Sequence, residues 1–176
     1  MIEKSILIIL PAADFNEQEF LIVKNTFEKA SYKIFIASDS YSLCTGSNGL
    51  KVRADVSFFN MHEKNFAAVV FIGGSGVMKY WDNPTLHLIA KSFQKNRKPV
   101  AAICSAPVIL AKAGLLSKIE ATCHNSNKKD IERSGAIYKD SPVVVSENII
   151  TANGPAVAAD FTKAIINQVT KRFASV

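Results

Sequence analysis

The sequence predicts an α/β domain in which helices cover both faces of a mostly parallel sheet. Its short β-branched runs, such as residues 5–10 and 66–72, are apolar throughout, whereas a strand with one face in water alternates apolar and polar residues. Between these runs, apolar residues recur at spacings of three and four, as in helices that bury one face. Strands and helices that alternate in this way are typical of parallel sheets.

Length and composition indicate one domain over residues 1–176. The chain has 176 residues, of which 48% are hydrophobic and 20% charged, enough to build a sizeable core. No repeat, linker or low-complexity segment interrupts it.

The first half is expected to form two strands, a helix between them and an excursion. The helix carries Phe20, Val23 and Phe27 on its buried face, and the excursion resembles a hairpin with a turn at residues 47–49. In chain order the predicted ranges are 5–10 for a strand, 17–30 for the helix, 33–38 for a strand and 44–60 for the excursion.

The second half is expected to continue the alternation. Asn83 caps a helix whose first turn holds Pro84, a common arrangement at helix starts. The predicted ranges are 66–74 for a strand ending in glycines, 83–96 for the helix, 99–103 for a strand, 105–116 for a helix, 120–124 and 136–139 for short strands, 142–153 for two strands around a turn, and 155–173 for the closing helix.

Ligands of such sheets bind beyond the carboxyl ends of the strands. Those ends fall at Pro11 to Asp14, Gly73 to Gly76, Cys104, His124 and Asn153, so chemistry is expected there.

Cys104 lies where a predicted strand turns directly into a predicted helix. Ala102 and Ala106 stand two residues before and after it, and small residues at these places are what a nucleophile elbow needs. The amino end of the helix is expected to favour the thiolate and lower the pKa of Cys104. A buried core cysteine is the alternative explanation of a lone cysteine.

The neighbouring strand ends offer partners for this sulfur. Amides of Gly73 and Gly74, together with the amide of Ser105, are expected to form an oxyanion pocket. His124 is a candidate base or proton shuttle. One of Glu17 and Glu19 is expected to reach the same crevice, and the other to serve only as a charge at a helix start.

Charge and cysteine usage exclude several classes of function. The lysines behind the formal charge of +6 are scattered, so no nucleic-acid face is expected. The first ten residues are too short an apolar run to span a membrane and lack a cleavage site, which predicts a cytoplasmic protein. The three cysteines and three histidines show no metal spacing, so neither a metal nor a cofactor is expected, and disulfides are not expected either.

Taken together, the segments LIILPAADFNEQEF, VVFIGGSG, AAICSAPVILAKAGLL, TCHN and TANGPAVAADF resemble the ThiJ/PfpI superfamily over nearly the whole chain. The resemblance implies a flavodoxin-like three-layer fold, of the class I glutamine amidotransferase type, with a reactive elbow cysteine at Cys104. It assigns the thiolate's carboxyl partner to Glu19, the nearby histidine to His124, and the oxyanion amides to Gly74 and Ser105. It also implies a homodimer.

Two positions depart from the family pattern. The intracellular-protease branch has a histidine directly after the cysteine, and this chain has Ser105. The deglycase branch has an arginine before the late Gly-Pro, and this chain has Asn153, which puts an anion clamp there in doubt. Cys44 and Cys123 are interpreted as structural or interfacial thiols, with Cys123 expected on the opposite face of the sheet.

The leading functional hypothesis is therefore a cofactor-independent enzyme of the glyoxalase or deglycase type, in which the Cys104 thiolate attacks a small reactive carbonyl compound. The second is a redox sensor or protective chaperone that works by oxidation of Cys104 to a sulfinate. The third is a peptidase or amidase, which the absence of a histidine at position 105 disfavours.

Overall fold

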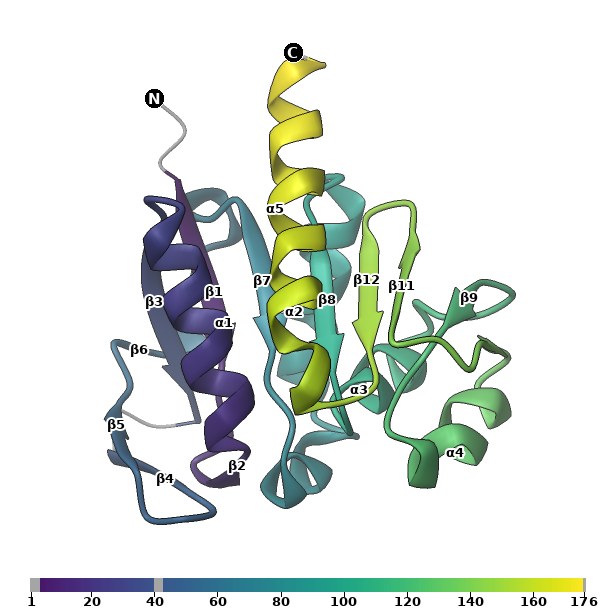
Figure 1. Cartoon of the computed structure of the whole chain (residues 1–176), viewed down its shortest axis with the longest axis horizontal. Coiled ribbons are helices and arrows are strands. Elements are labelled where there is room, and N and C mark those ends of the chain that lie inside the picture. The colour runs from purple at the N-terminus through teal and green to yellow at the C-terminus, as the bar shows by residue number, and fades with distance from the viewer. Residues whose placement is uncertain (1–3, 40–42, 176) are drawn as a thin grey trace.

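A seven-stranded sheet forms the centre of the molecule (Figure 1). The computed structural model describes residues 4–39 and 43–175. Neighbouring strands are parallel except for the edge strand β11, which is antiparallel to β12. The predicted mostly parallel sheet is thus confirmed. Across the sheet the order is β11 (Val143–Ser146), β12 (Ile149–Ala152), β8 (Val100–Ile103), β7 (Ala68–Phe71), β1 (Ser5–Ile9), β3 (Lys33–Ser38) and β6 (Val56–Ser57).

Both faces of the sheet are buried, because successive side chains of the central strands enter two separate apolar cores. In β8, Val100 and Ala102 belong to one core, while Ala101 and Ile103 belong to the other. Helices α1 (Glu17–Lys29) and α5 (Ala158–Ala174) cover the second core, and α2 (Pro84–Lys95) and α3 (Pro107–Lys112) cover the first, with α4 (Lys128–Arg133) beside α3 (Figure 1). No helix in the described ranges is long and apolar enough to cross a membrane.

Helices α1 and α2 begin after capping asparagines. The side chain of Asn16 accepts a hydrogen bond from the Glu19 amide at 3.0 Å, and that of Asn83 accepts one from the Leu86 amide at 3.1 Å. Pro84 occupies the first turn of α2, where its missing N–H costs no hydrogen bond.

The excursion after β3 is a hairpin, as predicted. Strands β4 (Leu43–Gly46) and β5 (Lys51–Arg53) pair antiparallel, and the short strand β2 (Ala13–Phe15), which was not predicted, pairs with β4. Short 3₁₀ helices fill other connections, at Phe58–Asn60, Glu63–Asn65, Ser75–Tyr80, Asn125–Asn127 and Pro155–Val157.

The prediction of a strand over residues 120–124 was wrong in extent. Only β9 (Glu120–Ala121) is a strand, and it pairs with β10 (Ile137–Tyr138) in a separate two-stranded sheet. The next amide, that of Thr122, donates instead to the side chain of Thr151 on β12, at 2.9 Å. This bond is buried and brings the segment before His124 against the main sheet.

Two predicted helices have different bounds. The helix predicted from residue 105 begins at Pro107 and ends at Lys112, where turns replace the rest. The closing helix begins at Ala158, after the 3₁₀ turn at Pro155–Val157. The sheet and its coverage are unaffected by either difference.

We expect Thr151→Val to lower the free energy of unfolding by about 1–3 kcal/mol, because it leaves the buried Thr122 amide without an acceptor at nearly constant side-chain volume. Urea unfolding measures the change. Thr162→Val is the matched control, since the buried Thr162 hydroxyl donates to the Ala158 carbonyl within its own helix and its removal leaves no unpaired amide. Equal losses in the two variants would contradict the role given to Thr151.

Candidate active site

Cys104 sits in a sharp turn directly after β8. Its φ of +64° lies in the left-handed region, which costs a non-glycine residue about 1 kcal/mol or more and is often found at functional sites. The turn is closed by the Ala106 amide, which donates to the Ile103 carbonyl at 3.1 Å. Ala102 and Ala106 are fully buried, so larger side chains at these two positions would not fit. This is the geometry of a nucleophile elbow.

Hydrogen bonds from three other segments fix the backbone of the elbow. The Cys104 amide donates to the Ala152 carbonyl of β12 at 2.9 Å, and the Cys104 carbonyl accepts from the His124 amide at 2.8 Å. The indole nitrogen of Trp81 donates to the Ser105 carbonyl at 3.0 Å. These bonds compensate for the unfavourable backbone conformation of Cys104.

Glu19 reaches the elbow from the first turn of α1, and Gly73 holds it there. The Gly73 amide donates to Oε2 of Glu19 at 2.9 Å, while the Gly73 carbonyl accepts from the amide of Asn16, the cap of α1, also at 2.9 Å. The other carboxyl oxygen, Oε1, is buried and has no nitrogen or oxygen partner. The thiol of Cys104 lies against the same carboxyl group, close enough to influence its pKa.

Gly73 has to be a glycine because three groups converge on it. A Cβ atom there would lie 2.7 Å from Cβ of Cys104 and 2.9 Å from Oε2 of Glu19, both far inside normal contact. The amide of Gly73 is therefore committed to Glu19, and its predicted part in an oxyanion pocket was wrong. Of the remaining predicted donors, the Ser105 amide lies close enough to the Cys104 sulfur to favour its thiolate, and the Gly74 amide has no acceptor among the described residues.

Burial dominates the titration of both acids. Glu19 is 0% exposed, and desolvation raises its pKa to about 7 against the favourable bonds from Gly73 and Cys104. Desolvation, followed by the charge of an ionised Glu19, raises the pKa of Cys104 to about 12. The predicted lowering of this pKa was wrong, because α3 is a helix of only six residues that begins at Pro107, and the burial of the sulfur outweighs its dipole.

His124 contacts the elbow through its backbone. Its amide binds the Cys104 carbonyl, but the imidazole makes no hydrogen bond to Cys104 in the described part of the chain. Instead, Nδ1 lies 2.5 Å from the Ser126 hydroxyl and accepts the Ser126 amide at 3.3 Å. Because Nδ1 is an acceptor, the neutral ring carries its proton on Nε2.

Glu17 holds the β4–β5 hairpin against α1, a role that was not predicted from the sequence. Its Oε1 accepts the amides of Asn48 and Leu50, at 2.7 and 2.9 Å, and so binds the β4–β5 hairpin to α1. Glu17 is thus more than a charge at a helix start. Of the two acidic residues, Glu19 is the one at the crevice, as the family resemblance implied.

The other two cysteines lie outside this cluster. Cys44 is buried in the hairpin, and Cys123 packs in the core on the opposite side of the sheet from Cys104. Burial raises the pKa of both thiols, to about 12 for Cys123. The opposite placement of Cys123 agrees with the expectation from the sequence.

A polar pocket of about 310 Å³ lies beside His124. Tyr138, Asp140 and Asn153 line it together with Cys123 and Asn125. Asn153 stands where an arginine was expected by analogy, so this pocket lacks that positive charge.

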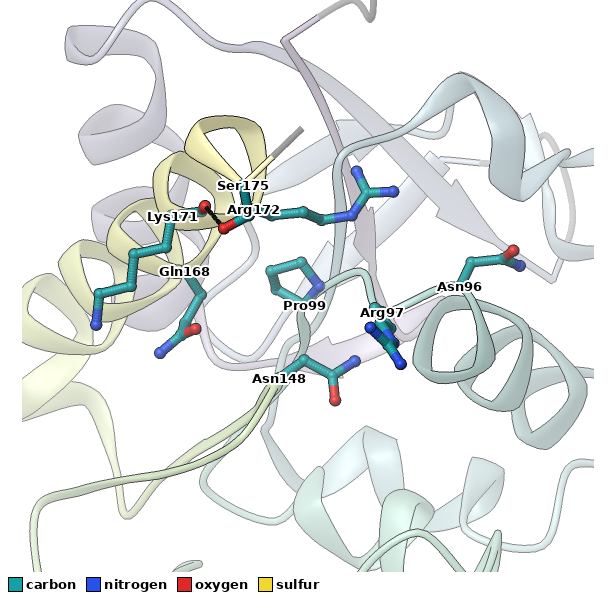
Figure 2. Close-up of a pocket in the computed structure, with 8 residues that line it drawn as sticks. All are labelled: Asn96, Arg97, Pro99, Asn148, Gln168, Lys171, Arg172 and Ser175. Carbon is teal, nitrogen blue, oxygen red and sulfur yellow. Dashed lines mark hydrogen bonds between the residues drawn. The ribbon is translucent and has the colours of Figure 1, made fainter.

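A second pocket, of about 430 Å³, lies at the opposite, amino-terminal edge of the sheet around Pro99 (Figure 2). Its cations, Arg97, Lys171 and Arg172, stand near the carboxyl ends of α2 and α5, where positive side chains offset exposed helix carbonyls. No cysteine or acid lines this pocket, and we do not place the active site there. Among the residues with described positions, no three histidine, cysteine or acidic side chains are grouped to hold a metal ion.

Comparison with known proteins agrees with this geometry. The family model of the DJ-1/PfpI family matches residues 4–168. The crystal structure of a ThiJ/PfpI domain protein from Brachyspira murdochii superimposes with a TM-score of 0.94 at 34% identity, covering 96% of this chain and 98% of that one. The predicted flavodoxin-like α/β fold is therefore confirmed.

Curated relatives carry names from different functional classes. A glutathione-independent glyoxalase of Caenorhabditis elegans is 28% identical, over 93% of this chain and 88% of its own. A putative cysteine protease of Bacillus subtilis is 32% identical, over 90% of this chain and 95% of its own length. A deglycase of Pyrococcus horikoshii is 29% identical, over 85% of this chain and 90% of its own length.

We expect Glu19→Gln to move the ionisation of Cys104 to lower pH by about one unit or more, because the neutral amide removes the repulsive charge that Glu19 carries above its pKa of about 7. Thiolate ultraviolet absorbance, measured during a pH titration against Cys104→Ser, reports this ionisation without the other two thiols. An unchanged titration, or one shifted to higher pH, would remove Glu19 from the site.

The same substitution is expected to alter how the free energy of unfolding depends on pH. A carboxyl group whose pKa is raised from 4.5 to about 7 on folding costs stability as pH rises through that window, by about 3 kcal/mol in full. Glu19→Gln removes this loss, so the variant gains on the wild type between pH 5 and pH 7 in urea unfolding. Parallel stability curves for the two proteins over this range would contradict the raised pKa.

Proposed function

Because this chain belongs to the DJ-1/PfpI family, we propose that it is a cysteine-dependent enzyme that converts small reactive carbonyl compounds in a glyoxalase or deglycase reaction. The observation that carries the proposal is the contact between a buried carboxyl group with a pKa of about 7 and the sulfur of an elbow cysteine. A site of this kind needs neither a metal nor a cofactor.

The first step is addition of sulfur to the aldehyde. Above pH 7 the pair carries one negative charge, with Glu19 as the carboxylate and Cys104 as the thiol. Glu19 takes the thiol proton as the sulfur attacks, so the reacting form is a thiolate beside a protonated carboxyl group. The sulfur forms a bond to the aldehyde carbon, and the electron pair of the C=O bond moves onto oxygen. Glu19 then gives its proton to that oxygen, which yields a neutral hemithioacetal and leaves a carboxylate.

For a 2-oxoaldehyde such as methylglyoxal, a second proton transfer completes the reaction. The Glu19 carboxylate takes the proton from the carbon bonded to sulfur, and the ketone oxygen gains a proton, which gives an enediol. The neighbouring carbon then takes a proton while the hydroxyl on the carbon bonded to sulfur loses one and becomes the thioester carbonyl. The hemithioacetal becomes a thioester of the hydroxy acid, with no net oxidation. Water hydrolyses this thioester, releases lactate and restores the thiol. Nε2 of His124 is our candidate for a second proton carrier, and the amides of Gly74 and Ser105 for binding the oxyanion.

A redox role is supported by one separate observation. Oε1 of Glu19 is buried without a nitrogen or oxygen partner, and a protonated carboxyl group there can donate to a sulfinate oxygen on Cys104. Two molecules of hydrogen peroxide would convert the thiolate to the sulfinate and be reduced to water. A mass gain of two oxygen atoms on Cys104, in a protein that turns over no carbonyl compound, would favour this second function.

The homodimer that the family resemblance implies stays a prediction.

We expect the purified, reduced protein to consume methylglyoxal, and Cys104→Ser to lower kcat by about 1000-fold or to background, because serine is a far weaker nucleophile at neutral pH. Lactate formation measures turnover. Cys44→Ser, which removes a buried thiol outside the site, is the control and should keep the activity. Equal turnover by the Cys104 and Cys44 variants would contradict the proposal.

We also expect peptide cleavage to be weaker than carbonyl turnover, despite the protease name of one relative. A peptidase has to protonate a poor amine leaving group, whereas here Ser105 follows the nucleophile and the His124 imidazole is bonded to Ser126. Fluorogenic peptides and methylglyoxal are to be compared on one preparation. Cleavage that depends on Cys104 and exceeds carbonyl turnover would assign the protein to the peptidases.

A further inference from the structure

Trp81 touches the elbow although it lies 23 residues before Cys104 in the chain. It follows the 3₁₀ turn at Ser75–Tyr80, and its half-buried indole N–H donates to the Ser105 carbonyl at 3.0 Å. This carbonyl accepts from no backbone amide of the described residues. Pro107 has no N–H to offer, and the Ile109 amide binds Ala106 instead. Trp81 thus supplies the donor that the short helix α3 does not.

The segment that carries Trp81 is itself fastened on three sides. Nε2 of His87 donates to the Trp81 carbonyl at 2.8 Å. On either side of Trp81, the Tyr80 hydroxyl donates to Asp39 at 2.7 Å, and Asp82 pairs with Lys112 of α3 at 2.8 Å. The backbone that carries the indole is therefore held in place, which lowers the ordering cost of its bond to the elbow.

Ser105 lies between two held peptide groups. Its N–H belongs to the peptide shared with Cys104, whose carbonyl accepts from the His124 amide, and this N–H and the Ser105 hydroxyl favour the thiolate form of Cys104. Its carbonyl belongs to the next peptide, shared with Ala106, and is the group that Trp81 holds. With both planar peptides held, the φ and ψ angles of Ser105 are fixed, and so is the placement of its N–H and hydroxyl beside the sulfur.

We propose that Trp81 is a positioning residue for the nucleophile: its indole N–H fixes the Ser105 carbonyl, and because the preceding peptide is held by the His124 amide, Ser105 keeps the conformation that places its amide and hydroxyl beside the Cys104 sulfur. The proposal rests on the proposed function only in taking Cys104 as the reacting group. It assigns Trp81 no contact with substrate.

The chain has a single tryptophan, so replacing tryptophan with an analogue changes only position 81. Incorporation of β-(3-benzothienyl)alanine in place of tryptophan exchanges the indole N–H for sulfur and keeps the bicyclic shape. Trp81→Phe removes the same donor and also some volume. Ser38→Ala is the matched control, because the buried Ser38 hydroxyl likewise donates to a backbone carbonyl, that of Leu10 at 2.8 Å, away from the elbow.

The experiment measures the rate at which iodoacetamide alkylates Cys104, at a series of pH values from neutral to alkaline. Peptide mapping identifies the alkylated cysteine. Loss of one hydrogen bond of ordinary strength is expected to slow alkylation by about threefold to tenfold and to move its midpoint to higher pH in the analogue and in Trp81→Phe. Ser38→Ala should match the wild type in both respects.

Alkylation of the analogue at the wild-type rate over the whole pH range would overturn the positioning role, as would an equal slowing in Ser38→Ala. The readout needs no carbonyl turnover. If the wild type proves inactive on methylglyoxal but the analogue still slows alkylation, the proposed function fails and the role of Trp81 stands.

Discussion

The buried carboxyl group of Glu19 lies against the thiol of Cys104, and much of the surrounding backbone serves to keep it there. Neither group can lose its proton cheaply in this apolar setting, and both cannot be ionised together without strong repulsion. Between pH 7 and about pH 12 the pair therefore holds one proton, which lies on the sulfur and can pass to Glu19. The proposed mechanism uses this transfer to produce an acid and a nucleophile together.

The fold brings the two groups together through parallel strands whose carboxyl ends share an edge. Gly73 after β7 binds Glu19 with its amide and α1 with its carbonyl, while β8 delivers Cys104 next to it. Only a glycine leaves the space for that approach. The unfavourable φ of Cys104 persists because β12, the His124 amide and Trp81 each satisfy one backbone group of the turn.

The fold class, the helix start at residue 17, the Asn83 cap and the elbow at Cys104 could be predicted, because apolar periodicity, caps and small residues are local signals. The bonds of Thr122 and Trp81 could not, since each joins positions more than 20 residues apart. The early end of the strand at residue 121 shows the same limit, because the next amide, that of Thr122, donates to the distant side chain of Thr151 and not to a neighbouring strand.

The pKa of Cys104 is the most instructive error. A cysteine before a helix looks activated in sequence, and the opposing cost of burial beside a carboxyl group appears only in three dimensions. Likewise, the residues alone left open which of the two glutamates at the start of α1 reaches the crevice. The family resemblance assigned Glu19, and the structure adds that Glu17 binds the hairpin.

The protonation of Glu19 is the property on which this account depends, and carbon-13 NMR of the glutamate side-chain carboxyl groups measures it directly. We predict one carboxyl resonance that titrates near pH 7, is missing in Glu19→Gln and shifts when Cys104 is replaced by serine. If every glutamate carboxyl titrates near the ordinary value of 4.5, the pKa of Glu19 is not raised by burial against Cys104, and the account is contradicted.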